Sequence, residues 1–346
     1  MRQPDGKLRW GILGTARIAR LKVIPAIQRS AHSEVVAIAS RSLEKARDTA
    51  RVLGIPKAYG SYAELLADAE IDVIYNPLPN DQHVALTLTA SRAGKHVLCE
   101  KPIGLTTADA ERLRDAPRDR IILEAFMVRF HPQWLRAREI IRSGELGEVR
   151  IITGFFGYHN VDPENIRNDR QKGGGAAWDI GCYPLVGARF LFESEPRRVV
   201  ALVDRDPSFG IDRVTSALVD FGGGRRLDFT VSTQSVPYQS IQVFGTKKRL
   251  EILIPFNAPQ GESTSLLIDD GSTLDRSSAR RETLPACDQY TEQADALARA
   301  IRGGPPLPYG VEDAIQNMRI LDALAESERQ NAWVELASES RFETKR

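Results

Sequence analysis

A lysine flanked by an acid and a proline is the first group in this chain that could handle a proton. Residues 98–106 read LCEKPIGLT, and an apolar run comes directly before Glu100, Lys101 and Pro102. A lysine can accept or donate a proton, and a neighbouring acid can hold it in place. One interpretation is a turn that merely ends a strand. The other is a rigidly held lysine at the carboxyl edge of a parallel sheet, where ligands bind.

A second proton-handling pair follows a glycine run in the second half of the chain. Residues 173–183 read GGGAAWDIGCY, so Asp179 and Tyr183 are four residues apart. If this stretch begins a helix, both side chains share one face. Lysine and tyrosine have unperturbed pKa values of about 10.4 and about 10, so both need their surroundings to lower the pKa before they act near neutrality. The alternatives are a helix cap for Asp179 and a core aromatic for Tyr183.

A turn of small residues near the amino terminus could hold a dinucleotide. Residues 11–19 read GILGTARIA, which places Gly14, Ala16 and Ala19 at the three small positions of the dinucleotide fingerprint. The motif ends the first expected strand and opens the first expected helix, so we predict a phosphate at the helix amino terminus. The alternative is an ordinary strand-to-helix turn. The predicted cofactor contacts are Gly14, Thr15, Ala16, Arg17 and Ile18.

The end of the second expected strand indicates which dinucleotide binds. An acid at this point would accept hydrogen bonds from the ribose 2′-hydroxyl of NAD. The chain has Ser40 and Arg41 there, with Lys45 one helical turn on. These side chains suit a 2′-phosphate, which favours NADP and leaves NAD possible. The alternative is an exposed polar turn.

A third loop ends another expected strand and should face the same ligand. Residues 75–83 read YNPLPNDQH, and in a parallel sheet they share the carboxyl edge with LCEKPIGLT. Asn80 has an alternative role as the cap of the next helix, and His83, inside that helix, has a structural alternative. The predicted cofactor contacts at this edge are Pro77, Leu78, Asn80, His83, Glu100 and Lys101.

These loops must be positioned by an alternation of strands and helices over residues 1–125. Strands are expected at residues 8–13, 35–39, 71–75, 96–99 and 121–123, and helices at 18–30, 43–53, 62–68, 82–93 and 107–115. Alternation of this kind predicts an α/β domain with a doubly wound, parallel Rossmann sheet.

Residues 126–346 have a different pattern. After a helix at 133–141, strands are expected at 149–156, 199–203, 213–221, 226–232, 240–244, 249–254 and 265–268, with helices at 288–302 and 311–329. Three glycines at 222–224 predict a hairpin. Strands without intervening helices indicate a C-terminal α+β domain with a large, mostly antiparallel open sheet.

The composition argues against several classes of protein. Lys and Arg number 47 against 46 Asp and Glu, so net charge offers no general attraction to nucleic acid or to an anionic membrane. The three cysteines and five histidines share no ligand spacing, so neither a disulfide framework nor a metal site is expected. The chain shows no apolar leader and no run that would span a bilayer, so we expect a cytoplasmic protein.

Together the motifs resemble the Gfo/Idh/MocA family of NAD(P)-dependent oxidoreductases, named for glucose-fructose oxidoreductase and inositol dehydrogenase. The resemblance runs from residues 9–14 through Glu100-Lys101-Pro102 to Asp179 and Tyr183. It implies that Lys101 is catalytic and that the Lys101-Pro102 peptide bond is cis. Tyr183, where inositol dehydrogenases have histidine, resembles the branch with dimeric dihydrodiol dehydrogenase, xylose 1-dehydrogenases and sugar ketoreductases.

Further contacts follow from the resemblance and from position. Residues 124–132, EAFMVRFHP, are similar to the family's crossover segment, which implies that Arg129 lies near the nicotinamide. The loop at 162–168 faces substrate in related sugar oxidoreductases, which makes Asn165 and Arg167 candidates. Phe156 and Tyr158 end the first strand of the second sheet and could stack on a sugar. For each residue the alternative is a solvated loop charge or a core aromatic.

The expected activity is hydride transfer between NADP and a ring carbon of an aldose or cyclic polyol, with aldose oxidation to a lactone as the leading case. We hypothesise that Lys101 and Tyr183 share the hydroxyl proton, Asp179 orients the substrate and Glu100 fixes the lysine. The alternatives are an aldose-aldose oxidoreductase with tightly bound NADP, a trans-dihydrodiol dehydrogenase, a sugar ketoreductase, and a nucleotide-sensing regulator without catalysis. The resemblance implies a homodimer or homotetramer formed through the C-terminal sheet.

Overall fold

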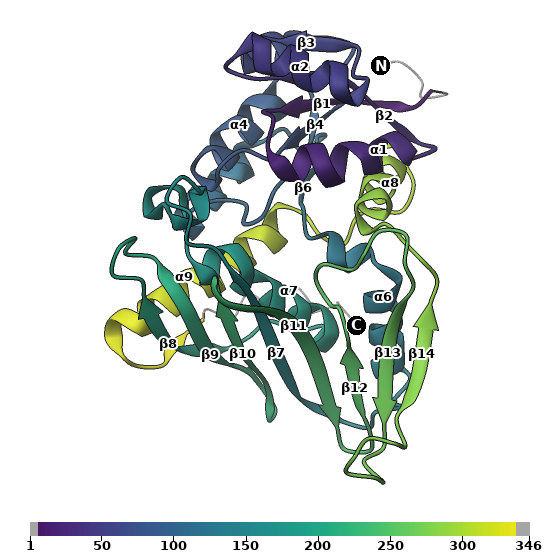
Figure 1. Ribbon diagram of the computed structural model, residues 1–346, viewed down its shortest axis with the longest axis vertical. Helices are drawn as coiled ribbons and strands as arrows, with labels where there is room; N and C mark the ends of the chain where they lie inside the picture. Colours follow the sequence, from purple (N-terminus) through teal and green to yellow (C-terminus); the bar gives the residue numbers. More distant parts are fainter. Residues whose placement is uncertain (1–5, 337–346) are drawn as a thin grey trace. The chain divides into compact units, whose positions relative to one another are not determined.

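The computed structural model describes residues 6–336, which form parts of two compact units (Figure 1). The first unit contains the chain up to Met127 and the later segment Asp288–Met318. The second contains Val128–Cys287 and the chain from Arg319 onward.

The first unit is built on a six-stranded parallel sheet with the order β3-β2-β1-β4-β5-β6. Its strands are β1 (Leu8–Leu13), β2 (Ser33–Ala39), β3 (Lys57–Tyr59), β4 (Val73–Asn76), β5 (His96–Cys99) and β6 (Ile122–Glu124). The winding reverses between β1 and β4, as in a doubly wound sheet, so the predicted Rossmann fold is confirmed. The carboxyl ends of β1, β4 and β5 therefore lie at the crevice where such sheets bind ligands.

Several helices of this unit begin at a residue whose side chain caps the first turn. They are α1 (Ile24–Arg29), α2 (Leu43–Leu53), α3 (Tyr62–Ala67), α4 (Asn80–Arg92), α5 (Thr107–Glu111) and α8 (Gln289–Ile301), with the short turns η1 (Ala19–Val23) and η2 (Arg112–Asp115). The hydroxyls of Ser42, Ser61 and Thr106 accept hydrogen bonds from first-turn amides, which satisfies donors that the helix itself leaves unpaired. Strand β3 was not expected, because three half-buried residues form no apolar run.

The first helix differs from its expectation in geometry. Instead of one α-helix over residues 18–30, a π-helical turn, η1, leads into α1. Pro25 lies at the start of α1 and has no amide hydrogen to donate to a carbonyl one α-turn back. The amide of Ile24 instead reaches the carbonyl of Ala19, five residues earlier.

The segment Asp288–Met318 belongs to the first unit, whereas the division expected at residue 125 assigned it to the second domain. It packs there through α8: Asp288 pairs with Arg29 at the end of α1, and the Thr291 hydroxyl donates to the carbonyl of Ala26 at 3.0 Å. Local sequence does not show that a later segment returns to the first unit. The apolar face of a helix predicts that the helix packs, but not against which unit.

The second unit is built on a nine-stranded sheet with the order β14-β13-β12-β11-β7-β10-β9-β8-β15. Its strands are β7 (Val149–His159), β8 (Arg198–Arg205), β9 (Asp212–Gly222), β10 (Arg225–Ser232), β11 (Gln234–Gly245), β12 (Arg249–Ile252), β13 (Thr264–Asp269), β14 (Arg280–Leu284) and β15 (Val334–Glu335). Within it β7 and β10 pair in parallel and the other neighbours with described registers are antiparallel. The expected hairpin joins β9 to β10, and all three of its glycines have positive φ. The predicted mostly antiparallel sheet is confirmed.

Helices α6 (Pro132–Arg142) and α7 (Cys182–Phe192) lie along one face of this sheet (Figure 1). Every residue of α7 is buried, and a Cβ on Gly187 would lie 2.6 Å from the Trp134 ring, so glycine lets the two helices approach closely. The last long helix, α9 (Val311–Gln330), begins in the first unit and ends in the second. The short turns are η3 (Met127–Phe130), η4 (Ile166–Asn168), η5 (Arg170–Lys172) and η6 (Ala177–Gly181).

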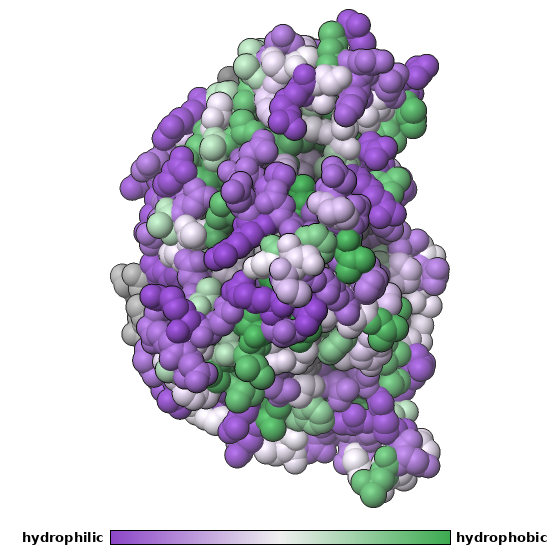
Figure 2. Space-filling model, turned by 60° about the vertical axis from the view of Figure 1, so that its left-hand side comes forward, coloured by the Kyte–Doolittle hydropathy of each residue, from purple (hydrophilic) through white to green (hydrophobic). Residues whose placement is uncertain are grey.

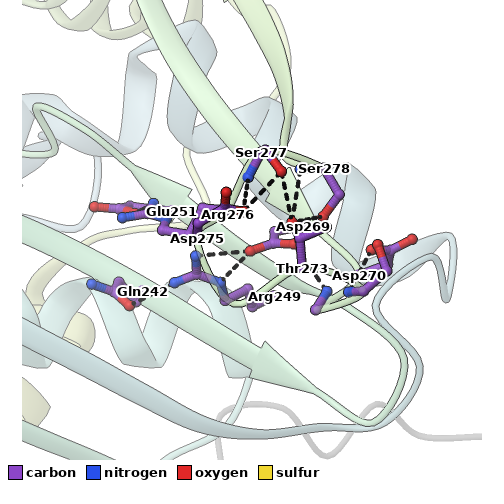
Figure 3. Close-up of polar contacts among 12 residues, drawn as sticks. Gln242, Arg249, Glu251, Asp269, Asp270, Thr273, Asp275, Arg276, Ser277 and Ser278 are labelled. Atoms are coloured by element: carbon purple, nitrogen blue, oxygen red, sulfur yellow. Dashed lines mark hydrogen bonds and ion pairs between the residues drawn. The ribbon is translucent and has the colours of Figure 1, made fainter.

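Charged side chains hold together one edge of this sheet (Figure 3). Asp269 at the end of β13 accepts two hydrogen bonds from Arg249, at 2.9 and 2.8 Å, and further hydrogen bonds from Ser278 and the Gly271 amide. Hydrogen bonds from a guanidinium and an amide stabilise the charged carboxylate, and the pKa of Asp269 is lowered, first by the Gly271 amide. This network fixes the hairpin between β13 and β14.

The face of the molecule shown in Figure 2 is mainly hydrophilic. On the face shown, apolar residues occur as small patches among charged and polar ones, as in ordinary globular proteins. Within residues 6–336 no helix combines the length and the hydropathy needed to cross a membrane.

Candidate active site

The turn after β1 has the geometry that a dinucleotide phosphate needs. Gly14 has φ +79°, and a Cβ at this position would lie 2.8 Å from Leu78 Cδ2. Both strain and space therefore favour glycine. The helical segment begins at Arg17, with Thr15 and Ala16 half-buried before it, and the amide hydrogens of its first turn are available to an anion. These residues fit the pyrophosphate of NAD(P).

Residues 40–43, directly after β2, carry positive charge and no acid. Arg41 and Lys45 are exposed, while Ser40 is buried. Burial raises the pKa of Tyr62, at the first residue of α3, and the charge of nearby Arg41 acts in the opposite direction. The Tyr62 hydroxyl would also lie 3.8 Å from a Cβ placed on Gly14. Arg41 and Tyr62 thus lie near the turn that fits the pyrophosphate, in the region that fits the adenosine end of a dinucleotide.

The loop after β4 lies against the glycine turn through Leu78. Asn80 is the first residue of α4, whose N-cap is Pro79 and has no side-chain cap hydrogen bond. Asn80 is therefore not the cap of this helix. Pro77 is buried, whereas Leu78 and Asn80 are partly exposed at the sheet edge.

His83 connects two loops of this edge. Its side chain is fully buried, with Nδ1 2.7 Å from the Pro102 carbonyl oxygen and Nε2 2.6 Å from that of Leu78. Burial lowers its pKa, and the charge of Lys101 acts in the same direction. A neutral ring has one N–H, so it donates to one carbonyl at a time. Both ring nitrogens face backbone carbonyls, so His83 has the structural role that was the alternative to cofactor contact.

Lys101 is the second residue after β5, at the same edge of the sheet. Its peptide bond to Pro102 is cis, as the resemblance implied. The preceding carboxylate, Glu100, accepts a hydrogen bond from the Tyr75 hydroxyl at 2.6 Å and, more weakly, from the Lys101 amide at 3.4 Å. Glu100 and Lys101 are half-buried. We call residues 100–103 the lysine segment.

The other end of the lysine segment is held by neighbouring elements. The Ile103 amide donates to Glu124 Oε1 in β6 at 2.8 Å, and the Pro102 carbonyl meets His83 in α4. Pro102 and Ile103 are buried. These contacts fix the backbone on which the Lys101 side chain is carried.

Asp179 lies inside the π-helical turn η6 and is not its cap. Its Oδ2 accepts hydrogen bonds from the Tyr158 hydroxyl at 2.5 Å and from Arg167 Nε at 3.0 Å, and its side chain is 12% exposed. The charge of Asp179 raises the pKa of Arg167, and Tyr158 and Tyr183 act in the same direction. Burial and the charge of Asp179 raise the pKa of Tyr158, so its hydroxyl stays protonated and donates. The structure thus brings four predicted substrate residues together, around an aspartate carried on a π-turn of the kind often found at functional sites.

The glycine run before η6 is required for close approach. Gly175 has φ +118°, and a Cβ there would lie 1.9 Å from Asp212 Oδ1. Asp212 is buried, and its Oδ2 accepts hydrogen bonds from the Ala177 amide at 2.7 Å and the Thr215 hydroxyl at 2.8 Å. Burial raises the Asp212 pKa. This carboxyl therefore anchors the beginning of η6 and with it the position of Asp179.

Tyr183 lies on α7 within a cluster of aromatic rings. Its ring centroid is 5.7 Å from that of Phe156 in an edge-on arrangement and 5.4 Å from that of Phe256. Phe156 stacks on Phe256 at 4.8 Å and is 5% exposed. Phe156 is thus a core aromatic residue, which was the alternative to stacking on a sugar. Its packing fixes the Tyr183 ring.

The remaining predicted contacts lie elsewhere in the second unit. Arg129, in the turn η3, is buried. The Asn165 side chain accepts a hydrogen bond from the Arg167 amide at 3.1 Å and begins η4, so it shapes the loop that carries Arg167. Among residues 6–336 no group of three or more His, Cys, Asp or Glu side chains could hold a metal ion.

Two family profiles match the chain in sequence order. Residues 8–120 match the oxidoreductase family with an NAD-binding Rossmann fold, and residues 134–251 match the GFO/IDH/MocA C-terminal domain. The D-xylose 1-dehydrogenase (NADP(+)) 2 of Haloferax volcanii is 38% identical over 333 residues, which cover 94% of this chain and 99% of that protein. The chain belongs to the Gfo/Idh/MocA family.

Solved structures of Gfo/Idh/MocA relatives agree with the fold. KijD10, a 3-ketoreductase from Actinomadura kijaniata in complex with NADP and TDP-benzene, has a TM-score of 0.86 and 28% identity, covering 93% of this chain and 98% of its own. The aldose-aldose oxidoreductase of Caulobacter crescentus, complexed with glycerol, has a TM-score of 0.86 and 28% identity, covering 96% and 100%. This Gfo/Idh/MocA member is accordingly an NAD(P)-dependent oxidoreductase.

Sequence reasoning missed the residues that hold the candidate catalytic groups. Tyr75, Tyr62, Asp212 and Phe256 were not predicted to contribute, and Glu124 was noted only as part of the crossover segment. Tyr75 offered one signal, because a tyrosine in a fully buried central strand needs a partner for its hydroxyl. Asp212 offered none, since an acid at the start of a strand usually faces water.

Proposed function

We propose that this protein is an NADP-dependent aldose dehydrogenase that oxidises the anomeric hydroxyl of a cyclic sugar to a lactone. The observation that carries this proposal is the cluster of Asp179, Arg167 and Tyr158 beside Tyr183. A carboxylate, a guanidinium and phenols offer both acceptors and donors, as recognition of several sugar hydroxyls requires. Similarity to a D-xylose 1-dehydrogenase supports an aldose substrate.

The proton chemistry is assigned to Lys101 and Tyr183. Removing hydride from a C–OH group leaves a carbonyl only if the hydroxyl proton also departs, so a base must contact that oxygen. We infer that Lys101 and Tyr183 share this proton, and that Asp179 accepts a hydrogen bond from the sugar to orient the reacting carbon. When bound, NADP supplies the nicotinamide ring carbon that takes up the hydride. In the reverse direction the same side chains return the proton.

The choice of NADP rests on the end of β2. Arg41 and Lys45 place two exposed cations near the Gly14 turn, and similarity to NADP-dependent and NADP-bound relatives supports the same cofactor. Arg41→Ala should raise the Kd for NADP about tenfold or more, since a charge-assisted hydrogen bond contributes roughly 1.5–3 kcal/mol. The Kd for NAD should change little. Arg47→Ala, another exposed arginine on α2, is the control, and equal weakening of both nucleotides by Arg41→Ala would contradict the assignment.

The decisive experiment is a substrate panel followed at the NADPH absorbance band. Pentoses, hexoses, inositols and trans-dihydrodiols would each be offered with NADP and with NAD, and the product of any active sugar would be tested for a lactone. We expect the highest kcat/KM for an aldose with NADP. Preference for an inositol or a dihydrodiol would contradict the aldose assignment, and nucleotide binding without turnover of any compound would favour a nucleotide-sensing regulator.

An aldose-aldose oxidoreductase is the second candidate. It is favoured by structural similarity to the Caulobacter crescentus enzyme of that name. In that case the protein purifies with NADP still bound, and one aldose is oxidised while another is reduced without free NADPH appearing. Exchange of added NADP during turnover argues for the dehydrogenase.

We further propose that two copies associate through the face of the nine-stranded sheet opposite α6 and α7. Large apolar side chains on these strands are exposed, among them Leu202, Leu218 and Tyr238. Large apolar side chains exposed on a sheet favour association. Light scattering should give a dimer or tetramer, and Leu202→Glu together with Leu218→Glu should shift it toward the monomer.

A further inference from the structure

Tyr75 has a polar contact that packing alone does not explain. It lies in β4, in the centre of the parallel sheet, and is completely buried. Its hydroxyl donates to Glu100 Oε1 at 2.6 Å. Phenylalanine would fill the same space without introducing a polar atom into the core, so the hydroxyl costs desolvation that this hydrogen bond must offset.

The pairing of β4 with β5 places the Tyr75 hydroxyl next to the lysine segment. Tyr75 pairs with Leu98, and Asn76 with Cys99, so the end of β4 runs beside the point where β5 ends and Glu100 begins. Glu100 is the residue directly before Lys101, and its other carboxylate oxygen accepts the Lys101 amide. A donor on Glu100 therefore acts one residue from the proposed base.

The phenol of Tyr75 keeps its proton at working pH and can therefore donate it to Glu100. Burial raises its pKa well above the usual value, and the charge of Glu100 acts in the same direction. The hydroxyl consequently stays neutral, and its hydrogen bond favours the charged form of the carboxylate.

We propose that Tyr75 is a positioning residue for Lys101, acting through Glu100. By holding one carboxylate oxygen, it fixes the rotamer of Glu100, and with it both the electrostatic field at Lys101 and the start of the lysine segment. This inference deepens the proposed function, because it requires Lys101 to be the proton-handling group.

The test uses Tyr75→Phe, which removes only the hydroxyl. Its matched control is Tyr59→Phe in the same unit, where a phenol donates to Asp68 at 2.8 Å, away from the lysine segment. Tyr75→Phe should lower kcat about tenfold or more, as expected for loss of a hydrogen bond to a charged group. The KM for the sugar and the Kd for NADP should each stay within about twofold. Tyr59→Phe should leave kcat unchanged.

Two readouts separate positioning from a structural role. The pH at which kcat/KM is half-maximal should move in Tyr75→Phe and not in Tyr59→Phe, since this profile reports the ionisation of the acid and base in the free enzyme. In a Glu100→Ala background, Tyr75→Phe should cause little further loss of kcat, because the two side chains act as one unit. A full additional tenfold loss in that background would overturn the proposal, as would an unchanged kcat and pH profile in the single variant.

The outcome is distinguishable from failure of the proposed function. If Lys101→Ala keeps near-normal turnover, the role of Lys101 is wrong whatever Tyr75 does. If Lys101→Ala is inactive and Tyr75→Phe behaves as wild type, only the positioning role fails. If Tyr75→Phe does not fold, Glu100→Ala removes the same hydrogen bond by changing its other partner, which is only half-buried. A normal kcat in Glu100→Ala would then overturn the inference.

Discussion

The lysine segment in the first unit and the glycine run with Asp179 in the second are both held by side chains from distant parts of the chain, but the contacts end on different atoms. On the lysine segment they include the backbone: the Pro102 carbonyl meets His83 and the Ile103 amide meets Glu124. On the second, Asp212 likewise meets a backbone amide, that of Ala177, but further contacts reach the functional group itself: Asp179 Oδ2 accepts hydrogen bonds from Tyr158 and Arg167.

This difference indicates how each region is tuned. The contacts described for the lysine segment fix the backbone that carries Lys101, so they act on the base through its position. A carboxylate held directly by a guanidinium and a phenol has its charge and orientation set by those partners. Substitutions around Lys101 should therefore alter kcat, whereas those around Asp179 should alter substrate binding as well.

Removing the lysine side chain should have the largest effect. Lys101→Ala should lower kcat/KM about a thousandfold, within the range expected when a general acid or base is lost, and leave the Kd for NADP nearly unchanged. Steady-state rates and nucleotide titration by fluorescence measure the two quantities. Near-normal turnover would remove the lysine segment from the chemistry.

Tyr183→Phe should follow, with a loss in kcat of about a hundredfold. The ring packing against Phe156 and Phe256 is retained, so the thermal midpoint should stay close to that of wild type. If Lys101 and Tyr183 serve the same proton, Lys101→Ala with Tyr183→Phe should be little slower than Lys101→Ala alone. Multiplying losses would mean that the two regions act on separate steps.

Arg167→Met tests the directly held carboxylate. Without its guanidinium, Asp179 should bind sugar about tenfold more weakly, seen mainly as a higher KM, because about 1.4 kcal/mol corresponds to tenfold. Lys172→Met is a matched control, since Lys172 pairs with Asp169 at 2.6 Å and its side chain is 42% exposed, against 43% for Arg167. A similar rise in KM for both variants would show only a general effect of charge.

The sequence offered motifs for the candidate catalytic residues but almost no signal for the contacts that support them. Lys101 stands in the short Glu100-Lys101-Pro102 motif, and Asp179 and Tyr183 lie four residues apart after a glycine run, so local patterns indicated all three. Strand alternation then predicted the edge to which β1, β4 and β5 all lead, since the ends of parallel strands share one side.

The supporting contacts join residues far apart in the chain. Tyr75 meets Glu100 and Asp212 meets Ala177 only after strand register and helix position are set. The glycine run at residues 173–175 gave no sign that a Cβ on Gly175 would meet the carboxyl of Asp212. No local pattern encodes such a close approach, because the partner residue is specified by the fold.

Acid should lower the stability of the first unit, which contains Lys101, because it protonates His96, the first residue of β5. Burial lowers the His96 pKa from its usual 6.5 to about 4, with Arg120 acting in the same direction, and its Nδ1 accepts the Ile121 amide at 3.0 Å, which a neutral ring permits. Between pH 6.5 and about 4, His96 binds a proton in the unfolded chain but stays neutral in the folded protein. Stability contributed by the neutral ring is therefore present above pH 6.5 and is lost as the pH falls toward 4.

His96→Asn, whose Oδ1 can accept the same amide, should show a smaller fall in thermal midpoint between pH 7 and pH 5 than wild type, by a few degrees, since about 1 kcal/mol shifts the midpoint of a large chain by roughly 2–4 °C. His159→Asn, an exposed histidine of the second unit, should fall as wild type does. Asp68, whose pKa is lowered to about 2, does not interfere, because its contribution is lost only below its usual 3.8. Equal falls in all three proteins would mean that acid does not act through the strand leading to the lysine.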